Sequence, residues 1–133
     1  MTFSDIVSAV DKWAARAGLP AYFGDEYVRN HQANAITGDF IFWDVPGGSR
    51  VYGEVSAEPL GLDVLIQVLG TSHYMKDLAA ELDVLERTFN VIESISKEVV
   101  CEFGVSLSRI VKRENIYDSQ KSGWEITFTL TDN

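Results

Sequence analysis

Hydrophobic residues along this chain follow two periods, one typical of helices and one of strands, and the changes of period divide the chain into elements. The first helix is predicted over residues 4–17, with Ser4 as its N-cap and Gly18 followed by Pro20 at its end. Its apolar face recurs at helical spacing and comprises Ile6, Val7, Val10, Trp13, Ala14 and Ala17. This face predicts a helix that packs on a core.

A second and longer helical period predicts a helix over residues 74–98, capped by Thr71 or Ser72. Residues 99–105 are expected to form the turn after this helix, with Gly104 within it. Its apolar stripe, which we expect to face the core, comprises Met75, Leu78, Ala79, Leu82, Leu85, Phe89, Ile92 and Ile95.

Alternating or continuous apolar residues predict five extended segments. They cover residues 39–45, 50–57, 61–70, 107–117 and 124–131. The first contains the densest aromatic and β-branched run, Phe40 to Trp43, and predicts a buried strand that ends in a turn at Pro46-Gly47-Gly48. The segment 61–70 is apolar on one side and half apolar on the other, which suits a central strand. The last two segments are expected to form a hairpin through a polar, mobile connection at 118–123.

The order of these elements predicts one α+β domain over residues 1–133. Its sheet is expected to be mostly antiparallel, with four to five strands, and the N-terminal helix and one long helix are expected to pack on one face. The connection 19–38 is too apolar for a free linker, and residues 25–30 within it are expected to form a helical turn.

The charge of the chain narrows the choice of partners. Eleven basic and 20 acidic residues give a formal net charge of −9. Affinity for DNA or RNA comes from Lys and Arg that neutralise phosphates, so this balance disfavours nucleic-acid binding. The acidity serves solubility, or it forms a surface that repels a polyanion, such as the wall of a channel for DNA. No run of about 20 apolar residues predicts a membrane helix, and the N-terminal residues resemble no secretory signal.

Residue types that carry chemistry are few and scattered. His31 and His73 lie in no metal-ligand pattern and are expected at the surface, whereas Cys101 is expected to be a small core residue. Gly47-Gly48 lacks the spacing of a phosphate-binding loop. Three acidic residues of the long helix are expected to form a solvated face: Glu81, Asp83 and Glu86. We therefore predict no catalytic, cofactor-binding or metal-binding residues, no cofactor and no enzymatic activity.

The order of several short features carries a resemblance to a known family. An N-terminal helix precedes a strand that ends in Trp43-Asp44-Val45-Pro46-Gly47-Gly48, and Pro59-Leu60 precedes a hydrophobic strand that ends in Gly70. The long helix follows, and the final strands flank Ser122-Gly123-Trp124. This layout resembles the tail terminator proteins of long-tailed bacteriophages, also called tail completion or head-tail joining proteins.

The resemblance implies a virion structural protein that forms a ring of six copies at the head-proximal end of the tail tube. Such a ring stops tube polymerisation and docks the tail to the neck. Its partners would be copies of itself, the tail tube protein and a neck or head-completion protein, and DNA would pass through its bore without specific binding. No membrane, cofactor or reaction is implied. The expected location is the tail-neck junction of the virion, and the host cytoplasm during assembly.

Exposure and aromatic content predict which residues contact neighbouring subunits. They are Tyr22, Phe23, Tyr27, Pro46, Gly47, Gly48, Arg50, Tyr52, Tyr117, Asp118 and Lys121. The segment 22–38 is expected to become ordered on assembly. Three alternatives stay open: a neck or head-completion adaptor, a small α+β ligand-binding or regulatory domain with a closed apolar pocket, and an enzyme that uses the acidic residues of the long helix.

Overall fold

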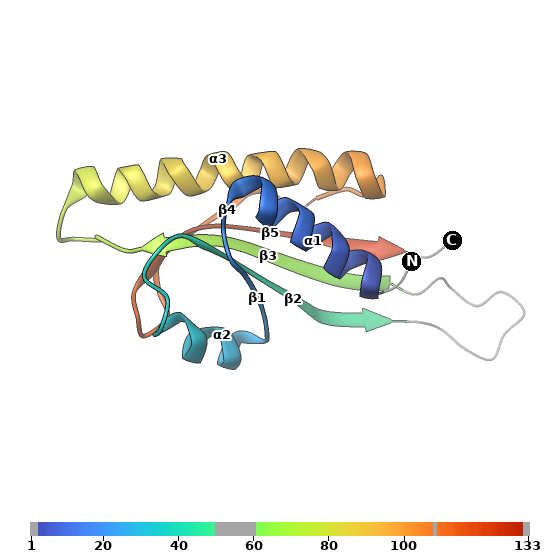
Figure 1. Ribbon diagram of the computed structural model, residues 1–133, viewed down its shortest axis with the longest axis horizontal. Coiled ribbons are helices and arrows are strands. Elements are labelled where there is room, and N and C mark those ends of the chain that lie inside the picture. The colour runs from blue at the N-terminus through green and yellow to red at the C-terminus, as the bar shows by residue number, and fades with distance from the viewer. Residues whose placement is uncertain (1–2, 50–60, 108, 132–133) are drawn as a thin grey trace, which may run out of the picture.

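A five-stranded sheet lies between two helices on one face and a short helix on the other (Figure 1). The computed structural model describes residues 3–49, 61–107 and 109–131 of the chain. In chain order the elements are α1 (Phe3–Ala17), β1 (Ala21–Phe23), α2 (Glu26–Ala33), β2 (Phe40–Ser49), β3 (Gly61–Thr71), α3 (Leu78–Phe103), β4 (Val111–Ile116) and β5 (Lys121–Thr131). The predicted α+β class, with an N-terminal helix and one long helix on the sheet, is confirmed.

The strands lie in the order β1-β2-β3-β5-β4. Only β1 and β2 run parallel, so the sheet is mostly antiparallel, as predicted. The central strand β3 pairs with β5 over its whole length, from Gly61 opposite Thr131 to Thr71 opposite Lys121. The predicted strand 50–57 lies outside the described residues.

Strand β2 does not end where its sequence predicts a turn. The run from Phe40 to Phe42 is fully buried, as expected, but the strand continues to Ser49. Its register against β3 shifts between Asp44 and Gly47, as in a β-bulge. Pro46 has no backbone N–H to give to a ladder, and a bulge is one of the few places in a strand that tolerate it. The turn prediction was therefore wrong.

The main core lies between the sheet and the pair α1 and α3. Each element presents its apolar face at the expected period, and a fully buried aliphatic side chain contributes about 1.5–3 kcal/mol. Fully or almost fully buried side chains here include Ile6, Val10 and Trp13 of α1, Ile92, Ile95 and Val99 of α3, and Val64, Ile66, Val68, Ile126 and Leu130 of the sheet.

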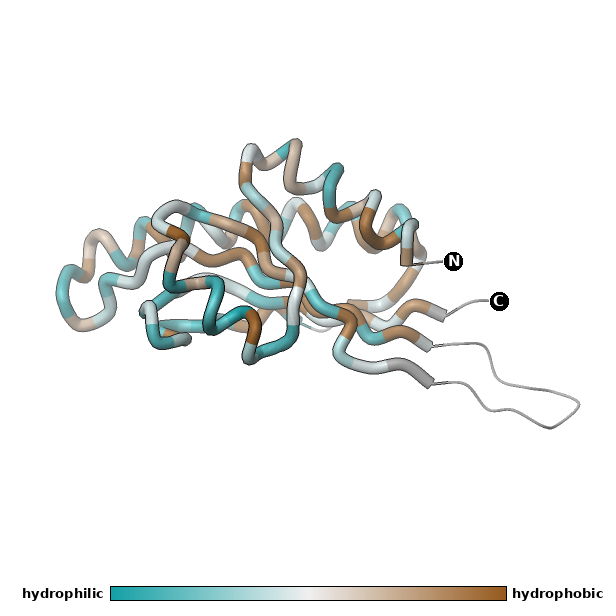
Figure 2. Tube along the Cα trace, turned by 60° about the horizontal axis from the view of Figure 1, so that its bottom comes forward, coloured by the Kyte–Doolittle hydropathy of each residue, from teal (hydrophilic) through white to brown (hydrophobic). Residues whose placement is uncertain are grey.

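The opposite face has its own helix, which corrects the prediction that all helices share one face. Phe40, Phe42 and Leu69 point to this side and form a second apolar cluster with Ala33 of α2. Apolar side chains on both faces of β2 and β3 need cover on both sides. Figure 2, with this side turned forward, shows α2 in mostly hydrophilic colours over the more hydrophobic strands.

The boundaries of α3 differ from those predicted. The N-cap is Asp77, whose carboxylate accepts the Ala80 N–H at 3.1 Å, because β3 extends to Thr71 and a turn follows it. The predicted caps Thr71 and Ser72 are therefore wrong. At the other end the helix continues to Phe103, and Gly104 closes it at a left-handed φ of 65°. Cys101 lies in these last turns and is exposed, so its predicted place in the core is wrong.

The C-terminal hairpin is confirmed, with a tighter connection than expected. Strand β5 begins at Lys121, so Ser122, Gly123 and Trp124 lie inside the strand and do not form a turn. The chain reverses over residues 117–120, where Tyr117 and Gln120 adopt positive φ. The predicted connection 118–123 was too long because buried Ser122 pairs with β3.

Candidate functional site

Large apolar side chains are exposed at the start of α3 and in the turn before it. Their exposed fractions are 90% for Met75, 74% for Leu78, 55% for Leu82 and 43% for Tyr74. We call these four residues the apolar tip. The segment that carries them forms one end of the molecule (Figure 1). The helix was predicted to bury the whole stripe that includes Met75, Leu78 and Leu82, and for these three residues and Ala79 the prediction was wrong.

The rotation of α3 about its axis explains this exposure. The helix turns Glu81, Val84 and Thr88 towards the sheet, so the neighbouring stripe of Leu78 and Leu82 points past it. Further along the helix, the same stripe is half-buried because Trp124 of β5 reaches it. The centroids of the Trp124 and Phe89 rings lie 5.1 Å apart, and the Trp124 indole N–H donates to the Leu85 carbonyl at 2.7 Å.

Strand β4 lies beside the apolar tip and forms one edge of the described sheet. A cleft of about 530 Å³ separates them, and its lining includes Leu78 and Leu82 from the helix and Lys112 and Glu114 from the strand. An edge strand offers backbone hydrogen-bonding groups to another chain. The cleft therefore joins an apolar surface to an edge that can pair.

A buried carboxylate lies at the inner end of this cleft. Glu81 accepts the His73 backbone N–H at 2.7 Å and the Ser122 hydroxyl at 2.8 Å. Burial raises the pKa of Glu81, but these two donors and the Glu114 carboxyl outweigh burial and lower it overall. Burial and the proximity of Glu81 raise the pKa of Glu114, against the opposing effect of Lys112. The proximity of the two carboxyls therefore shifts their pKa values in opposite directions.

The acidic residues of α3 were predicted to form a solvated face, and the structure divides them. Asp83 and Glu86 are exposed, which confirms the prediction for both. Glu81 is buried, because the preceding turn and β5 provide donors for its carboxylate. Among the described residues, no group of three or more His, Cys, Asp or Glu is placed to hold a metal ion.

A chain of hydrogen bonds crosses the other face of the sheet beneath α2. The Arg29 Nε donates to the Tyr117 hydroxyl at 3.0 Å, and this hydroxyl donates to Gln67 Oε1 at 2.6 Å. The Gln67 amide then donates to Glu125 at 2.7 Å. Buried Arg29 also lies 3.3 Å from the carboxylate of Asp44. Burial raises the pKa of Tyr117, although its hydrogen bond with Arg29 opposes this.

These groups line a polar cleft of about 470 Å³. Its side chains satisfy one another, so they hold α2 and the 117–120 turn against the sheet. Arg113 at its edge pairs with Glu125 at 3.3 Å. The charged groups Arg29, Arg113 and Glu125 of this cleft are therefore paired within the chain.

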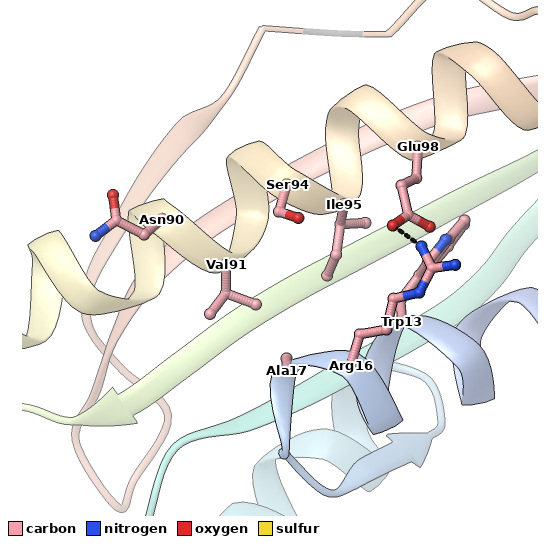
Figure 3. A pocket seen from close by; sticks show the side chains of 8 residues that line it. All are labelled: Trp13, Arg16, Ala17, Asn90, Val91, Ser94, Ile95 and Glu98. Carbon is pink, nitrogen blue, oxygen red and sulfur yellow. Dashed lines mark hydrogen bonds and ion pairs between the residues drawn. The ribbon is translucent and has the colours of Figure 1, made fainter.

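A smaller groove of about 210 Å³ lies between α1 and α3 (Figure 3). Val91 and Ile95 point from α3 towards α1, and Arg16 reaches from α1 to form an ion pair with Glu98. Trp13 also lines the groove, and its buried indole Nε1 has no hydrogen-bond partner in the described structure. The full lining is Trp13, Arg16, Ala17, Asn90, Val91, Ser94, Ile95 and Glu98.

The residues predicted to contact neighbours fall into exposed and covered groups. Exposed side chains are Phe23, Tyr27, Pro46 and Asp118. Tyr22 is half-buried against Phe40 and Phe42, and Tyr117 belongs to the hydrogen-bond chain. Gly47 and Gly48 pair with β3 in the bulged strand. Arg50 and Tyr52 lie outside the described residues.

Lys121 was predicted at the surface, and the structure buries it to 4% exposure. Its ammonium group donates to the Ile36 carbonyl at 2.5 Å and lies over the Phe40 ring. Burial lowers the pKa of Lys121. The connection 22–38 contains α2 and the last two residues of β1, and it packs on the sheet within a single copy of the chain.

Sequence reasoning missed the apolar tip and the α1–α3 groove. Both depend on how far a helix is rotated against its neighbours, and the periodicity of one segment carries no information about that angle.

No helix in the described parts is both long and apolar enough to cross a bilayer. A scan against protein-family models found no match to the chain, and a search of curated proteins found none either.

Proposed function

We propose that this chain is a structural assembly protein whose copies join into a closed ring. The observation that carries the proposal is the apolar tip, with Met75, Leu78 and Leu82 all more than half exposed. Exposed apolar side chains gathered on one surface mark interaction sites in soluble proteins. Methionine adapts its shape to a partner, which suits such a contact.

The position of the tip favours a ring over a two-fold dimer. A contact between one end of a molecule and a different surface of the next copy is heterologous, and such contacts give a ring where their rotation closes and an open filament where it does not. The edge strand β4 lies beside the tip and can add backbone hydrogen bonds to the same contact.

The proposed ring is of the tail-terminator type. It caps the head-proximal end of a phage tail tube, stops tube polymerisation and docks the tail to a neck protein. The proposal is supported by the layout of the sequence and by the net charge of −9, which suits a bore through which DNA passes without binding. Its place in the virion is the tail-neck junction, and it requires no reaction and no cofactor.

Mass in solution tests the ring. Light scattering and electron microscopy of the purified chain are expected to show a ring, formed alone or on the ends of tail tubes. The double substitution Leu78→Asp/Leu82→Asp is expected to give a folded monomer. The matched control is Val100→Asp, which changes an exposed apolar residue near the other end of the same helix and leaves the ring intact. A wild-type chain that stays monomeric, even with tube ends present, would contradict the proposal.

Binding order tests the role in the tail. A terminator binds the ends of preassembled tail tubes and prevents their further growth. A neck or head-completion adaptor binds the portal and leaves tube growth unchanged. Tube length with and without the protein, measured by electron microscopy, separates these functions, and unchanged tubes would overturn the terminator role.

A further inference from the structure

The cleft between the apolar tip and β4 combines apolar walls with two carboxyls. Leu78, Leu82 and Leu85 line it from α3, and its lining also includes Glu81 and Glu114. At about 530 Å³ the cleft has room for a long side chain, and it opens beside tip residues that are more than half exposed. A group that fills this cleft therefore needs an apolar stem and an end that suits a carboxylate.

The two carboxyls lie close together and lack a matching pair of cations. Glu81 and Glu114 are within hydrogen-bonding reach of each other, and burial and the proximity of Glu81 raise the pKa of Glu114. Lys112 opposes this rise without cancelling it. Its Nζ lies 3.6 Å from Glu114 Oε1, beyond hydrogen-bonding distance, and its side chain is 51% exposed. The Glu114 carboxylate is therefore incompletely neutralised within a single copy.

The other charged groups that line the cleft do not supply the missing cation. Lys76 Nζ donates to Gln120 Oε1 at 3.2 Å, and the Asp77 carboxylate caps α3 by accepting the Ala80 N–H. The lining contains two lysines and three acids, so when all are ionised it carries one excess negative charge. These five are Lys76, Asp77, Glu81, Lys112 and Glu114.

Charge limits which surface of a neighbouring copy can cover the tip. Each copy has a formal net charge of −9, and like net charges oppose association. An apolar or acidic covering surface would bury Glu114 without a partner, and burial of an unpaired charge is costly. A basic group opposite Glu114 reduces both penalties. Charge complementarity therefore favours a covering surface with a cation at this point.

We propose that the neighbouring copy covers the tip with a surface that carries a Lys or Arg side chain, and that this side chain enters the cleft and pairs with Glu114. The inference rests on the proposed ring and specifies the chemistry of the covering surface. The aliphatic stem lies against Leu78 and Leu82, since Lys and Arg commonly bury their stems along apolar surface. The tip shields the ion pair from water, which makes the pair stronger than the exposed contact with Lys112.

A glutamine at position 114 separates this role from a purely structural one. Glu114→Gln is expected to stabilise the isolated chain at neutral pH, because it removes a charge that is unfavourable beside Glu81. The same change is expected to weaken self-association about tenfold, because it removes the carboxylate from the ion pair. A side chain that only supports the fold would move both quantities in the same direction. Urea denaturation and sedimentation velocity measure the two effects.

Glu86→Gln is the matched control. Glu86 is an exposed acid of α3 that does not line the cleft, and its replacement removes the same unit of charge. This variant is expected to change self-association by less than about twofold, as exposed charges usually do. If it weakened self-association as much as Glu114→Gln, the effect would come from net charge, and the proposed pairing would be wrong.

Small cations test the cleft directly. n-Hexylammonium has an apolar stem and a charged end, so it is expected to bind the chain and to compete with self-association. Hexanol lacks the charge and ethylammonium lacks the stem, and each is expected to bind at least about tenfold more weakly. Binding is followed by NMR titration, and competition by sedimentation velocity. Equal binding of hexanol, or binding of n-hexylammonium that is unchanged in Glu114→Gln, would contradict the inference.

The outcomes distinguish this inference from the ring. A ring that forms equally well with Glu114→Gln overturns the basic side chain in the cleft and leaves the proposed function standing. A chain that stays monomeric but binds n-hexylammonium through Glu114 assigns the cleft to a free amine, which overturns both the pairing between copies and the ring. A chain that neither associates nor binds n-hexylammonium also overturns both.

Discussion

The two faces of the sheet are held by different interactions. The face under α1 and α3 is packed with aliphatic side chains such as Ile66 and Ile92. The face under α2 has a small apolar cluster, and beside it lies the hydrogen-bond chain from Arg29 through Tyr117 to Gln67. Apolar contacts are non-directional, whereas hydrogen bonds specify geometry. The first face therefore supplies most of the stability, and the second fixes where α2 and the 117–120 turn lie.

The contrast is tested most strongly by removing the buried charge beneath α2. Arg29→Met is expected to destabilise the fold by about 3–5 kcal/mol, because it leaves the Asp44 carboxylate buried without its partner. The double variant Arg29→Met/Asp44→Leu is expected to recover most of this loss, since the uncompensated charge is gone. Urea denaturation of the wild type and both variants measures the effect. Equal losses in the single and double variants would contradict this account.

On the other face, the comparable change is the truncation of an aliphatic side chain. Ile66→Ala is expected to cost about 2–5 kcal/mol, because it leaves a cavity in the packed core. Leu82→Ala removes a side chain of similar size from the apolar tip and is expected to change the stability of the monomer by less than about 0.5 kcal/mol. If urea denaturation of the monomer showed a large loss in the free energy of unfolding for Leu82→Ala, the tip would support the fold.

The hydroxyl of Tyr117 links the two arms of the hydrogen-bond chain. Tyr117→Phe is expected to cost about 1–3 kcal/mol, because Arg29 and Gln67 each lose a partner in a part-buried place. Tyr27→Phe is the matched control, since Tyr27 is exposed, and no change is expected. Thermal unfolding of both variants measures the difference. A loss for Tyr27→Phe as large as that for Tyr117→Phe would assign the effect to something other than the chain.

Periodicity predicted the elements on the face under α1 and α3 well and those on the face under α2 poorly. The helix over 4–17 and the central strand over 61–70 follow from regular spacing of apolar residues, and both lie where expected. The apolar residues on the second side of β2 and β3 were visible in the sequence, but nothing in it identified α2 as their cover. Segment 25–30 was expected to be only a helical turn, and it became the start of an eight-residue helix.

Charged residues were the hardest to place from the sequence. Glu81 and Lys121 were expected in water, and both are buried because partners distant in the sequence satisfy them. Cys101 was expected in the core, and it is exposed because α3 turns Val99 and Phe103 towards the core at this point instead. The apolar tip was misplaced because α3 turns Glu81 and Val84 towards the sheet, so Leu82 on the neighbouring stripe is left exposed.

The smallest expected effects concern a polar site on the face under α1 and α3, where Glu81 lies close to Glu114. The lowered pKa of Glu81 contributes stability above its unfolded pKa, near 4.5, and this contribution is lost as the pH falls through the folded value. The raised pKa of Glu114 makes stability change with pH in the opposite direction. Its contribution is complete below pH 4.5 and is lost as the pH rises through the folded value.

Glutamine substitutions at these two positions are therefore expected to act in opposite directions at neutral pH. Glu114→Gln imitates the protonated carboxyl, so it is expected to raise the free energy of unfolding at pH 7 and to leave it almost unchanged at pH 4. Glu81→Gln removes a carboxylate that accepts the His73 N–H and the Ser122 hydroxyl, so it is expected to lower stability at pH 7 and less so at pH 4. Urea denaturation at both pH values measures the four differences. If Glu114→Gln destabilised the protein equally at both pH values, the raised pKa of Glu114 and its origin in burial beside Glu81 would be contradicted.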